Sequence, residues 1–300
     1  MKAGADELYC AVPALPAYGS AELLPDKDLK PAIKAAHALG VKISLAVNSM
    51  FIPCARAGAR RLLDRLAALD QAGLDAFIVS SPALFALLKE RGGLKARLHL
   101  SSIQPCFNSE TVKLFLGYGV TRVIFPNQLS GAEAAPAIKL CRKAGAETEI
   151  FDYRFFGCTY VNGRCKLHRP SFHTFVKVKE GAALCRSGSG TWRGLGLKSF
   201  DADPARAGEL REVSGRVAAR LGCGGPLRIA DSGAFFDYFS AGTDFLKYGT
   251  RSDPSEAKAR RVAAMRAMIA AAGEVSAKFP HKKARAAFVE KMNRWDPHGF

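Results

Sequence analysis

A regular alternation of strand-like and helix-like segments over the first 151 residues constrains the fold most strongly. Short runs rich in β-branched and aromatic residues alternate with longer amphipathic segments, and glycines stand at many of the joins. The expected strands are residues 7–12, 41–47, 75–79, 97–100, 122–125 and 147–151, and the expected helices are residues 28–39, 55–72, 82–91, 109–116 and 131–144. Asp26 or Asp28 is the expected cap of the first helix. The order predicts parallel strands with crossover helices, and the nearly constant repeat of about 25 residues favours a closed (β/α)8 barrel of the TIM type over an open doubly wound sheet.

The alternation breaks after residue 151 and later resumes. An excursion over residues 153–200 comes first. The later expected elements are helices at residues 204–221 and 234–241, strands at 227–230 and 244–248, a long helix at 255–272 and a basic helix at 282–292. We therefore expect residues 1–272 to form the barrel, with the excursion at its C-terminal rim. Residues 273–300 are expected to form a basic C-terminal helix and tail.

Three of the eight cysteines lie in this excursion. Six residues separate Cys158 from Cys165, and nineteen more precede Cys185. Thiolates gathered by one loop suit a soft metal or an iron–sulfur cluster, although this spacing is not that of a zinc finger. The alternative is three unrelated buried thiols, which behave as small hydrophobic groups.

The charge balance favours anionic partners. Lys and Arg number 44 against 27 acidic residues, which gives a formal net charge of +17. Between residues 153 and 200 there are nine basic residues and a single acid, Glu180. Nucleic acid and acidic small molecules are the partners that such a surface fits. Two alternatives remain: a host with high-GC coding, or a basic segment that balances the negative charge of a thiolate-bound cluster.

The chain shows no sequence feature of a membrane or secreted protein. Its apolar runs stop far short of a membrane span, and acids occupy the start where a signal peptide would need an apolar core. We therefore expect no membrane partner and a cytoplasmic location, where the cysteines would be reduced thiols rather than a disulfide framework.

Polar side chains follow the expected strands at their carboxyl ends, where barrel enzymes place their active sites. Arg154 and Arg251 could clamp a carboxylate or phosphate in bidentate fashion. The alternative is that many of these residues are loop caps and surface hydrogen-bonding groups. The expected substrate-binding residues are Asn48, Ser101, Arg154, Lys247 and Arg251.

Several motifs, in their order along the chain, resemble the peptidase U32 family. The Glu149–Phe151 strand followed by Gly157-Cys158 and the Cys-x4-Gly-x-Cys loop from Cys158 to Cys165 is similar to the family signature. Further matches are the Gly-Ala-Asp-Glu-Leu-Tyr run of residues 4–9, the expected strands at 41–48 and 99–101, and Asp244-Phe-Leu-Lys with Arg251. The resemblance extends over roughly residues 4–265 and implies a barrel fold.

The resemblance also implies a cofactor and a class of reaction. Some family members are oxygen-independent hydroxylases that hold a [4Fe-4S] cluster on four cysteines. They act on RNA bases or on a quinone precursor, and prephenate is the implied hydroxyl donor. The implied cluster ligands here are Cys158, Cys165 and Cys185, with Cys223 as the fourth. The resemblance identifies no catalytic residue.

The chain departs from the family pattern in three places. One extra residue separates Glu149 from Cys158, and Gly249 and Thr250 stand where the family usually has Glu and Gly. Many members carry a fourth cysteine shortly after the third, where this chain has residues 187–190. Cys223 is the only downstream candidate, and Cys106, in a rim loop, is the most plausible spare. Cys10, Cys54 and Cys141 are expected to be structural.

The start of the chain lies inside the first βα unit of the family pattern. Either that unit is absent or the true start lies upstream. If it is absent, the barrel has an uncovered edge next to its last strand, which is a pairing liability. The expected strand at residues 227–230 or a partner subunit could close it, so a homodimer or heterodimer is expected.

Two other functions stay open. The historical family name implies a collagenase-like peptidase, but neither Gly-x-Ser-x-Gly nor His-Glu-x-x-His is present. A nucleophilic pair of Cys158 with His168 or His173 is compatible with the sequence. The third alternative is a basic RNA-binding module without catalysis.

Overall fold

Seven parallel strands form one sheet whose spatial order follows the chain, from β1 to β7. The computed structural model describes residues 3–17, 23–53, 55–126, 129–152, 232–249 and 254–294. The strands are β1 (Glu7–Cys10), β2 (Lys42–Val47), β3 (Ala76–Val79), β4 (Arg97–Leu100), β5 (Val120–Ile124), β6 (Glu147–Phe151) and β7 (Phe245–Lys247). This sequential order contradicts an open doubly wound sheet, in which the strand order reverses.

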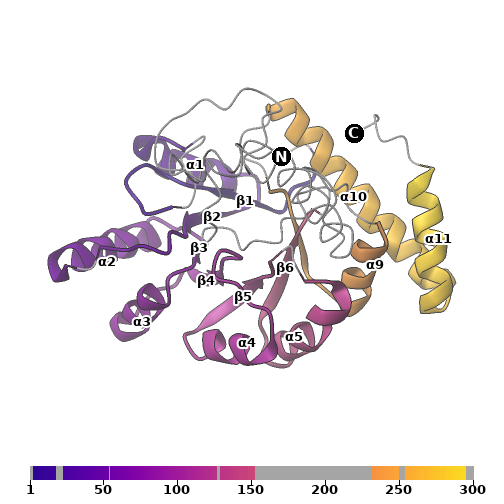
Figure 1. Ribbon diagram of the computed structural model, residues 1–300. Helices are drawn as coiled ribbons and strands as arrows, with labels where there is room; N and C mark the ends of the chain where they lie inside the picture. Colours follow the sequence, from indigo (N-terminus) through magenta and orange to yellow (C-terminus); the bar gives the residue numbers. More distant parts are fainter. Residues whose placement is uncertain are drawn as a thin grey trace, which may run out of the picture.

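The described helices are α1 (Leu29–His37), α2 (Arg56–Gln71), α3 (Pro82–Arg91), α4 (Ser109–Leu116), α5 (Gly131–Lys143), α9 (Ser232–Ala241), α10 (Ser255–Lys278) and α11 (His281–Asn293), with a short 3-10 turn η1 (Asp26–Asp28) before α1. Helices α1 to α5 and α9 follow one another around the outside of the curled sheet, and α10 and α11 pack beside α9 (Figure 1). The alternation read from the sequence is thus confirmed in its described part. The expected helix 255–272 continues to Lys278 as α10.

Local side-chain chemistry explains where several helices begin. Ser81, Asn108 and Ser130 stand at the N-caps of α3, α4 and α5, and each accepts a hydrogen bond from a backbone N–H of the first turn. At α5 the Glu133 carboxylate also accepts from the Ser130 N–H, which completes a capping box. Of the two expected caps of α1, Asp28 stands at the N-cap, but its side chain makes no capping hydrogen bond, and Asp26 lies in η1.

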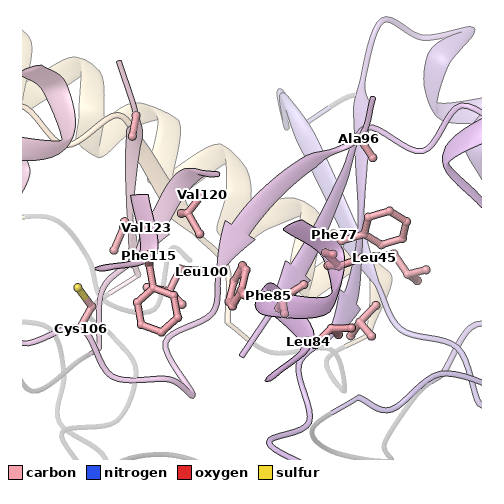
Figure 2. Packing of buried hydrophobic residues seen from close by; sticks show 14 of the residues in the cluster. Leu45, Phe77, Leu84, Phe85, Ala96, Leu100, Cys106, Phe115, Val120 and Val123 are labelled. Atoms are coloured by element: carbon pink, nitrogen blue, oxygen red, sulfur yellow. The ribbon is translucent and has the colours of Figure 1, made fainter. Parts of the chain in front are cut away.

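An apolar core fills the space between the sheet and the helices. Leu45, Phe77 and Leu100 point outward from their strands, toward the helices, and are fully buried. Figure 2 shows them with Phe85 of α3 and Phe115 of α4, whose rings meet edge to face with centroids 5.2 Å apart. Each fully buried side chain of this size contributes about 1.5–3 kcal/mol, so this layer is a main source of stability.

The sheet curls like part of a TIM barrel, but the described strands do not close it. Among the described residues no backbone ladder joins β1 to β7. A side chain spans this gap instead, since the Tyr9 hydroxyl donates to the Tyr248 carbonyl oxygen at 3.1 Å. Helix α10 also reaches β1, because the Arg266 Nε donates to the Gly4 carbonyl oxygen at 2.7 Å. The class and the sheet topology are confirmed, whereas closure of an eight-stranded barrel stays a prediction.

Several expectations lie outside the described residues. They are the cysteine excursion at residues 153–200, the helix at 204–221 and the strand at 227–230. Among the described helices, none is both long enough and apolar enough to cross a membrane.

Candidate functional site

The two faces of the sheet differ in chemistry because successive strand residues point to opposite sides. The outer face packs on α1–α5 and is apolar. The inner face carries ionisable side chains at alternate positions of β4, β5 and β6: Arg97 and His99, then Arg122, then Glu147 and Glu149. Register brings them side by side, since His99 is paired with Arg122 and Arg122 with Glu147.

Arg122 is the centre of an ionic network on this inner face. Its side chain is 1% exposed. The guanidinium binds the Glu7 carboxylate through two hydrogen bonds of 2.6 and 2.7 Å, and reaches Glu147 at 2.8 Å and Glu149 at 3.0 Å. It also lies over the Phe245 ring, 3.6 Å from the centroid. Burial alone would lower the pKa of Arg122, but the hydrogen bonds and charges of Glu7 and Glu149 outweigh it and raise that pKa.

Glu149 joins this network to the last strand. Burial favours its neutral form, but the positive charges of Lys247 and Arg122 hold the pKa of Glu149 below its ordinary value. The Lys247 Nζ donates to Glu149 at 2.8 Å and lies 4.1 Å from the centre of the Tyr9 ring. The network therefore links β1, β5, β6 and β7, and it crosses the gap between the first and last strands.

His99 is the buried polar side chain that this network leaves without a hydrogen bond. The residue is 2% exposed, and in the described part of the chain neither ring nitrogen has a partner. Burial, with the positive charges of Arg122, Arg97, Lys247 and Lys42, lowers the pKa of His99 to about 2. The imidazole is therefore neutral at physiological pH and offers one donor and one acceptor.

A cavity of about 570 Å³ lies beside this network, between the inner face and α10. Its polar wall includes Ser44, His99 and Arg122, and its apolar wall includes Val262, Met265 and Ile269 of α10. The volume falls within the range of small-molecule sites. A second, smaller cavity of about 60 Å³ also borders His99.

Helix α10 is fixed to the sheet by further ion pairs. The Arg261 Nε donates to Asp152 at 2.9 Å, and the Asp152 side chain is fully buried just after β6. Arg266 pairs with Asp6 just before β1. The helix thus spans from the carboxyl end of β6 to the amino end of β1.

The structure brings together some of the predicted substrate-binding residues. Asn48 and Ser101 follow β2 and β4 at their carboxyl ends, and the Asn48 Nδ2 donates to the Ser101 Oγ at 3.3 Å. Lys247 is the last residue of β7, and its ammonium forms an ion pair with Glu149. Arg154 and Arg251 lie outside the described residues, as do Cys158, Cys165, Cys185 and Cys223.

Two of the cysteines expected to be structural or spare are buried among apolar groups. Burial raises the pKa of the Cys106 thiol to about 12, and burial with the negative charge of Asp244 raises that of Cys141 to about 12. Such thiols are poor nucleophiles and poor metal ligands at neutral pH. Within the described residues, no group of three or more His, Cys, Asp or Glu side chains could hold a metal ion.

Five residues of this region were not predicted from the sequence: Glu7, Arg122 and Glu147 of the network, the unpartnered His99, and Arg261 of α10. One signal could have found most of them. Strands over Arg97–Leu100 and Glu147–Phe151 carry charged or polar residues at every second position, which is unusual for strands expected to be buried on both faces.

These residues therefore define the class of the protein: an α/β protein whose curled parallel sheet carries charged side chains on its inner face. The model of Peptidase family U32 matches residues 1–186 of the 300, and the chain belongs to this family.

Two curated relatives carry the name tRNA hydroxylation protein P. The relative from Escherichia coli (strain K12) is 31% identical over 164 residues, which are 55% of this chain and 35% of that protein. The relative from Haemophilus influenzae (strain ATCC 51907 / DSM 11121 / KW20 / Rd) is 30% identical over 164 residues, 55% of this chain and 34% of that protein. The chain thus spans about a third of the length of these relatives. A solved structure, that of the U32 peptidase Mk0906, aligns at 15% identity with a TM-score of 0.41, over 50% of this chain and 61% of that one.

Proposed function

We propose that this chain takes part in the oxygen-independent hydroxylation of an RNA base, with tRNA as the substrate. The observation that carries the proposal is its similarity, over 164 residues, to two proteins named for tRNA hydroxylation. The formal net charge of +17 supports it, because a basic protein is attracted to a polyanion. A small aromatic or quinone-like substrate is the alternative within the same class of reaction.

The proposed cofactor is a [4Fe-4S] cluster held by Cys158, Cys165, Cys185 and Cys223. Four thiolates are the usual ligand set of such a cluster, so the donor chemistry of these residues fits it. When bound, the cluster would supply one-electron redox chemistry. The protein around it would position the substrate, and the proposed donor is a carboxylate such as prephenate.

The proposed role of the rim residues is to hold this anionic donor. Arg154, Lys247 and Arg251 would bind its carboxylates, and Asn48 with Ser101 would bind its hydroxyl or carbonyl groups. Lys247 is already paired with Glu149 at 2.8 Å. A donor carboxylate would therefore share this ammonium with Glu149, and it would be oriented along the inner face.

Iron analysis after anaerobic purification tests the cofactor. Cys158→Ser or Cys165→Ser should remove both iron and activity. Cys10→Ser and Cys141→Ser are the matched controls, because these residues lie in β1 and α5 of the described fold, and both should keep iron. Cys223→Ser tests the fourth ligand: full retention of iron would transfer that role to Cys54, to an exogenous group, or to Cys106 despite its raised pKa.

Mass spectrometry of tRNA nucleosides tests the activity. Deletion of the gene in its host should remove one nucleoside that is heavier than its precursor by a single oxygen atom. Wild-type protein should restore it, whereas Cys158→Ser should not. An unchanged nucleoside profile would overturn the tRNA proposal and leave the small aromatic substrate.

Salt dependence of RNA binding separates an RNA enzyme from a small-molecule enzyme. Each phosphate that a basic side chain neutralises releases a counterion, so the affinity for tRNA should fall steeply with salt. A protein that shows no binding to tRNA at low salt would exclude RNA as the substrate. Salt-sensitive binding without any change in the nucleosides would support the alternative of a basic RNA-binding module.

Peptidase activity is the second candidate, because the family carries that name. The high pKa values of the Cys106 and Cys141 thiols make both unsuitable as nucleophiles, so this candidate depends on Cys158 with His168 or His173. Gelatin digestion by the purified protein tests it. Cleavage that Cys158→Ser abolishes would favour the peptidase.

A further inference from the structure

We propose that the cavity between the inner face of the sheet and α10 binds an uncharged small organic molecule with one apolar side and one hydrogen-bonding group. His99 is the residue that would recognise that group. This inference does not depend on the proposed hydroxylation, because it rests on His99 and α10, although the cavity also borders Lys247 of the proposed donor site. The proposed site lies between the inner face and α10, whereas Asn48 and Ser101 lie at the carboxyl ends of the strands.

The first support is the hydrogen-bonding state of His99. Buried polar groups in folded proteins almost always have a partner, and those that lack one need an explanation. Here the imidazole is 2% exposed, borders the cavity of about 570 Å³, and has no partner among the described residues. A ligand that donates to or accepts from this ring would supply the missing hydrogen bond.

The charges around the cavity decide which ligand fits. The inner-face acids Glu7, Glu147 and Glu149 are all held by Arg122. Lys247 binds Glu149, and Arg97 binds Glu147. Each cation of the network thus has an acidic partner, and His99 is neutral. The cavity also borders Lys258 and Arg266 of α10, and Arg266 pairs with Asp6. Because the charges of the network are paired with one another, an amide, a carbonyl or a hydroxyl is the group that fits His99.

The opposite wall of the cavity, on α10, determines the remaining part of the ligand, which should be apolar. Between Lys258 and Arg266 at its edges, this wall carries the apolar side chains of Val262, Met265 and Ile269 of α10. A molecule that packs an apolar ring or chain against α10 and turns its polar group to His99 would match both walls. Most ligand sites have this composition, in which apolar walls surround a few placed polar groups.

Benzamide is a suitable probe, because it combines a ring with a neutral amide. Titration into protein labelled with 15N-histidine should shift the ring nitrogens of His99, with an affinity on the order of 1 mM for so small a ligand. Benzoate and benzylammonium carry the same ring with opposite charges, and both should bind at least tenfold more weakly. Equal or tighter binding of either ion would overturn the proposed class of ligand.

Three variants test whether benzamide binds in this cavity. His99→Leu should abolish benzamide binding while raising the melting temperature of the ligand-free protein, because it removes two buried nitrogens without partners. Ser80→Ala is the matched control: Ser80 is also buried with an unpartnered hydroxyl, but it does not line the cavity. It should raise the melting temperature and leave binding unchanged. Val262→Phe should block binding by filling the cavity from α10, with His99 intact.

Two results would overturn the proposal. The first is the absence of any His99 shift with benzamide in a folded wild-type protein. The second is a large loss of stability in His99→Leu, since that would mean that His99 is satisfied by internal water and has a structural role. Failure of the tRNA test would leave this proposal intact, because no step of it involves RNA or the cysteines.

Discussion

On its outer face the sheet presents Leu45, Phe77 and Leu100 to the helices, whereas on its inner face neighbouring residues of the same sheet present Arg122, Glu149 and Lys247. The outer contacts are apolar and non-directional, so no single side chain there depends on one particular partner. The inner contacts are hydrogen-bonded ion pairs, and each charged group depends on its neighbour. The outer face therefore stabilises the fold, whereas the inner face holds polar groups that are costly to bury.

Replacement of Arg122 by Met gives the largest expected effect. The change keeps a long apolar side chain but removes the cation that pairs with Glu7 and one of the two cations that pair with the buried Glu149. Removal of one partner from a buried ion pair costs about 3–5 kcal/mol, so urea unfolding should show a loss of that size in the free energy of unfolding.

Leu45→Met is the matched control on the outer face. Leu45 is fully buried in β2, and exchange of Leu for Met at nearly constant volume costs less than about 1.5 kcal/mol. Equal losses in the two variants would contradict the comparison, because they would mean that the ionic network is worth no more than ordinary packing.

The pH dependence of stability gives the second effect, and His99 determines it. Its folded pKa of about 2 lies below the ordinary value of 6.5, because burial and the nearby cations Arg122, Arg97, Lys247 and Lys42 disfavour the charged ring. Below about pH 6.5 His99 therefore binds a proton in the unfolded chain but not in the folded protein. The free energy of unfolding falls as the pH falls. The loss is about 1.4 kcal/mol per pH unit, or about 2 kcal/mol between pH 6.5 and pH 5.

Urea unfolding of wild type and His99→Leu at several pH values checks this expectation. The variant should lose most of the slope in that window, because the network carboxylates of Glu147 and Glu149 have lowered pKa values and titrate at lower pH. An identical slope in both proteins would show that His99 takes up a proton in the folded state.

How far the sequence predicted these features depends on whether the relevant contacts are local. The strand over Arg97–Leu100 and the helices over Pro82–Arg91 and Ser109–Leu116 were placed to the residue, because alternation, capping residues and glycines are short-range properties. The sequential order of the sheet followed from the nearly constant repeat of about 25 residues, which favoured a barrel over a doubly wound sheet.

The ionic network could not be predicted in the same way. Arg122 and Glu7 are 115 positions apart, and only the curl of the sheet brings β1 opposite β5. The unpartnered state of His99 is likewise a property of three-dimensional packing. Lys247 was expected at the rim as a substrate-binding residue, and only the structure reveals its ion pair with Glu149. The cysteine ligands remain a prediction from spacing and resemblance.

The smallest expected effect concerns the gap between the first and last strands. Tyr9→Phe removes the hydroxyl that donates to the Tyr248 carbonyl oxygen at 3.1 Å, but it keeps the ring beneath the Lys247 ammonium. The variant should therefore lose only the hydrogen bond, which is worth about 0.5–1.5 kcal/mol, and retain the cation–π contact. Tyr9→Leu removes both and should cost more in the same unfolding measurement. If Tyr9→Phe proved as stable as wild type while Tyr9→Leu were strongly destabilised, the gap would be held by the ring and Lys247. If both were neutral, the two strands would be held together by α10 through Arg266 and Gly4, and by the ion pair of Arg122 with Glu7.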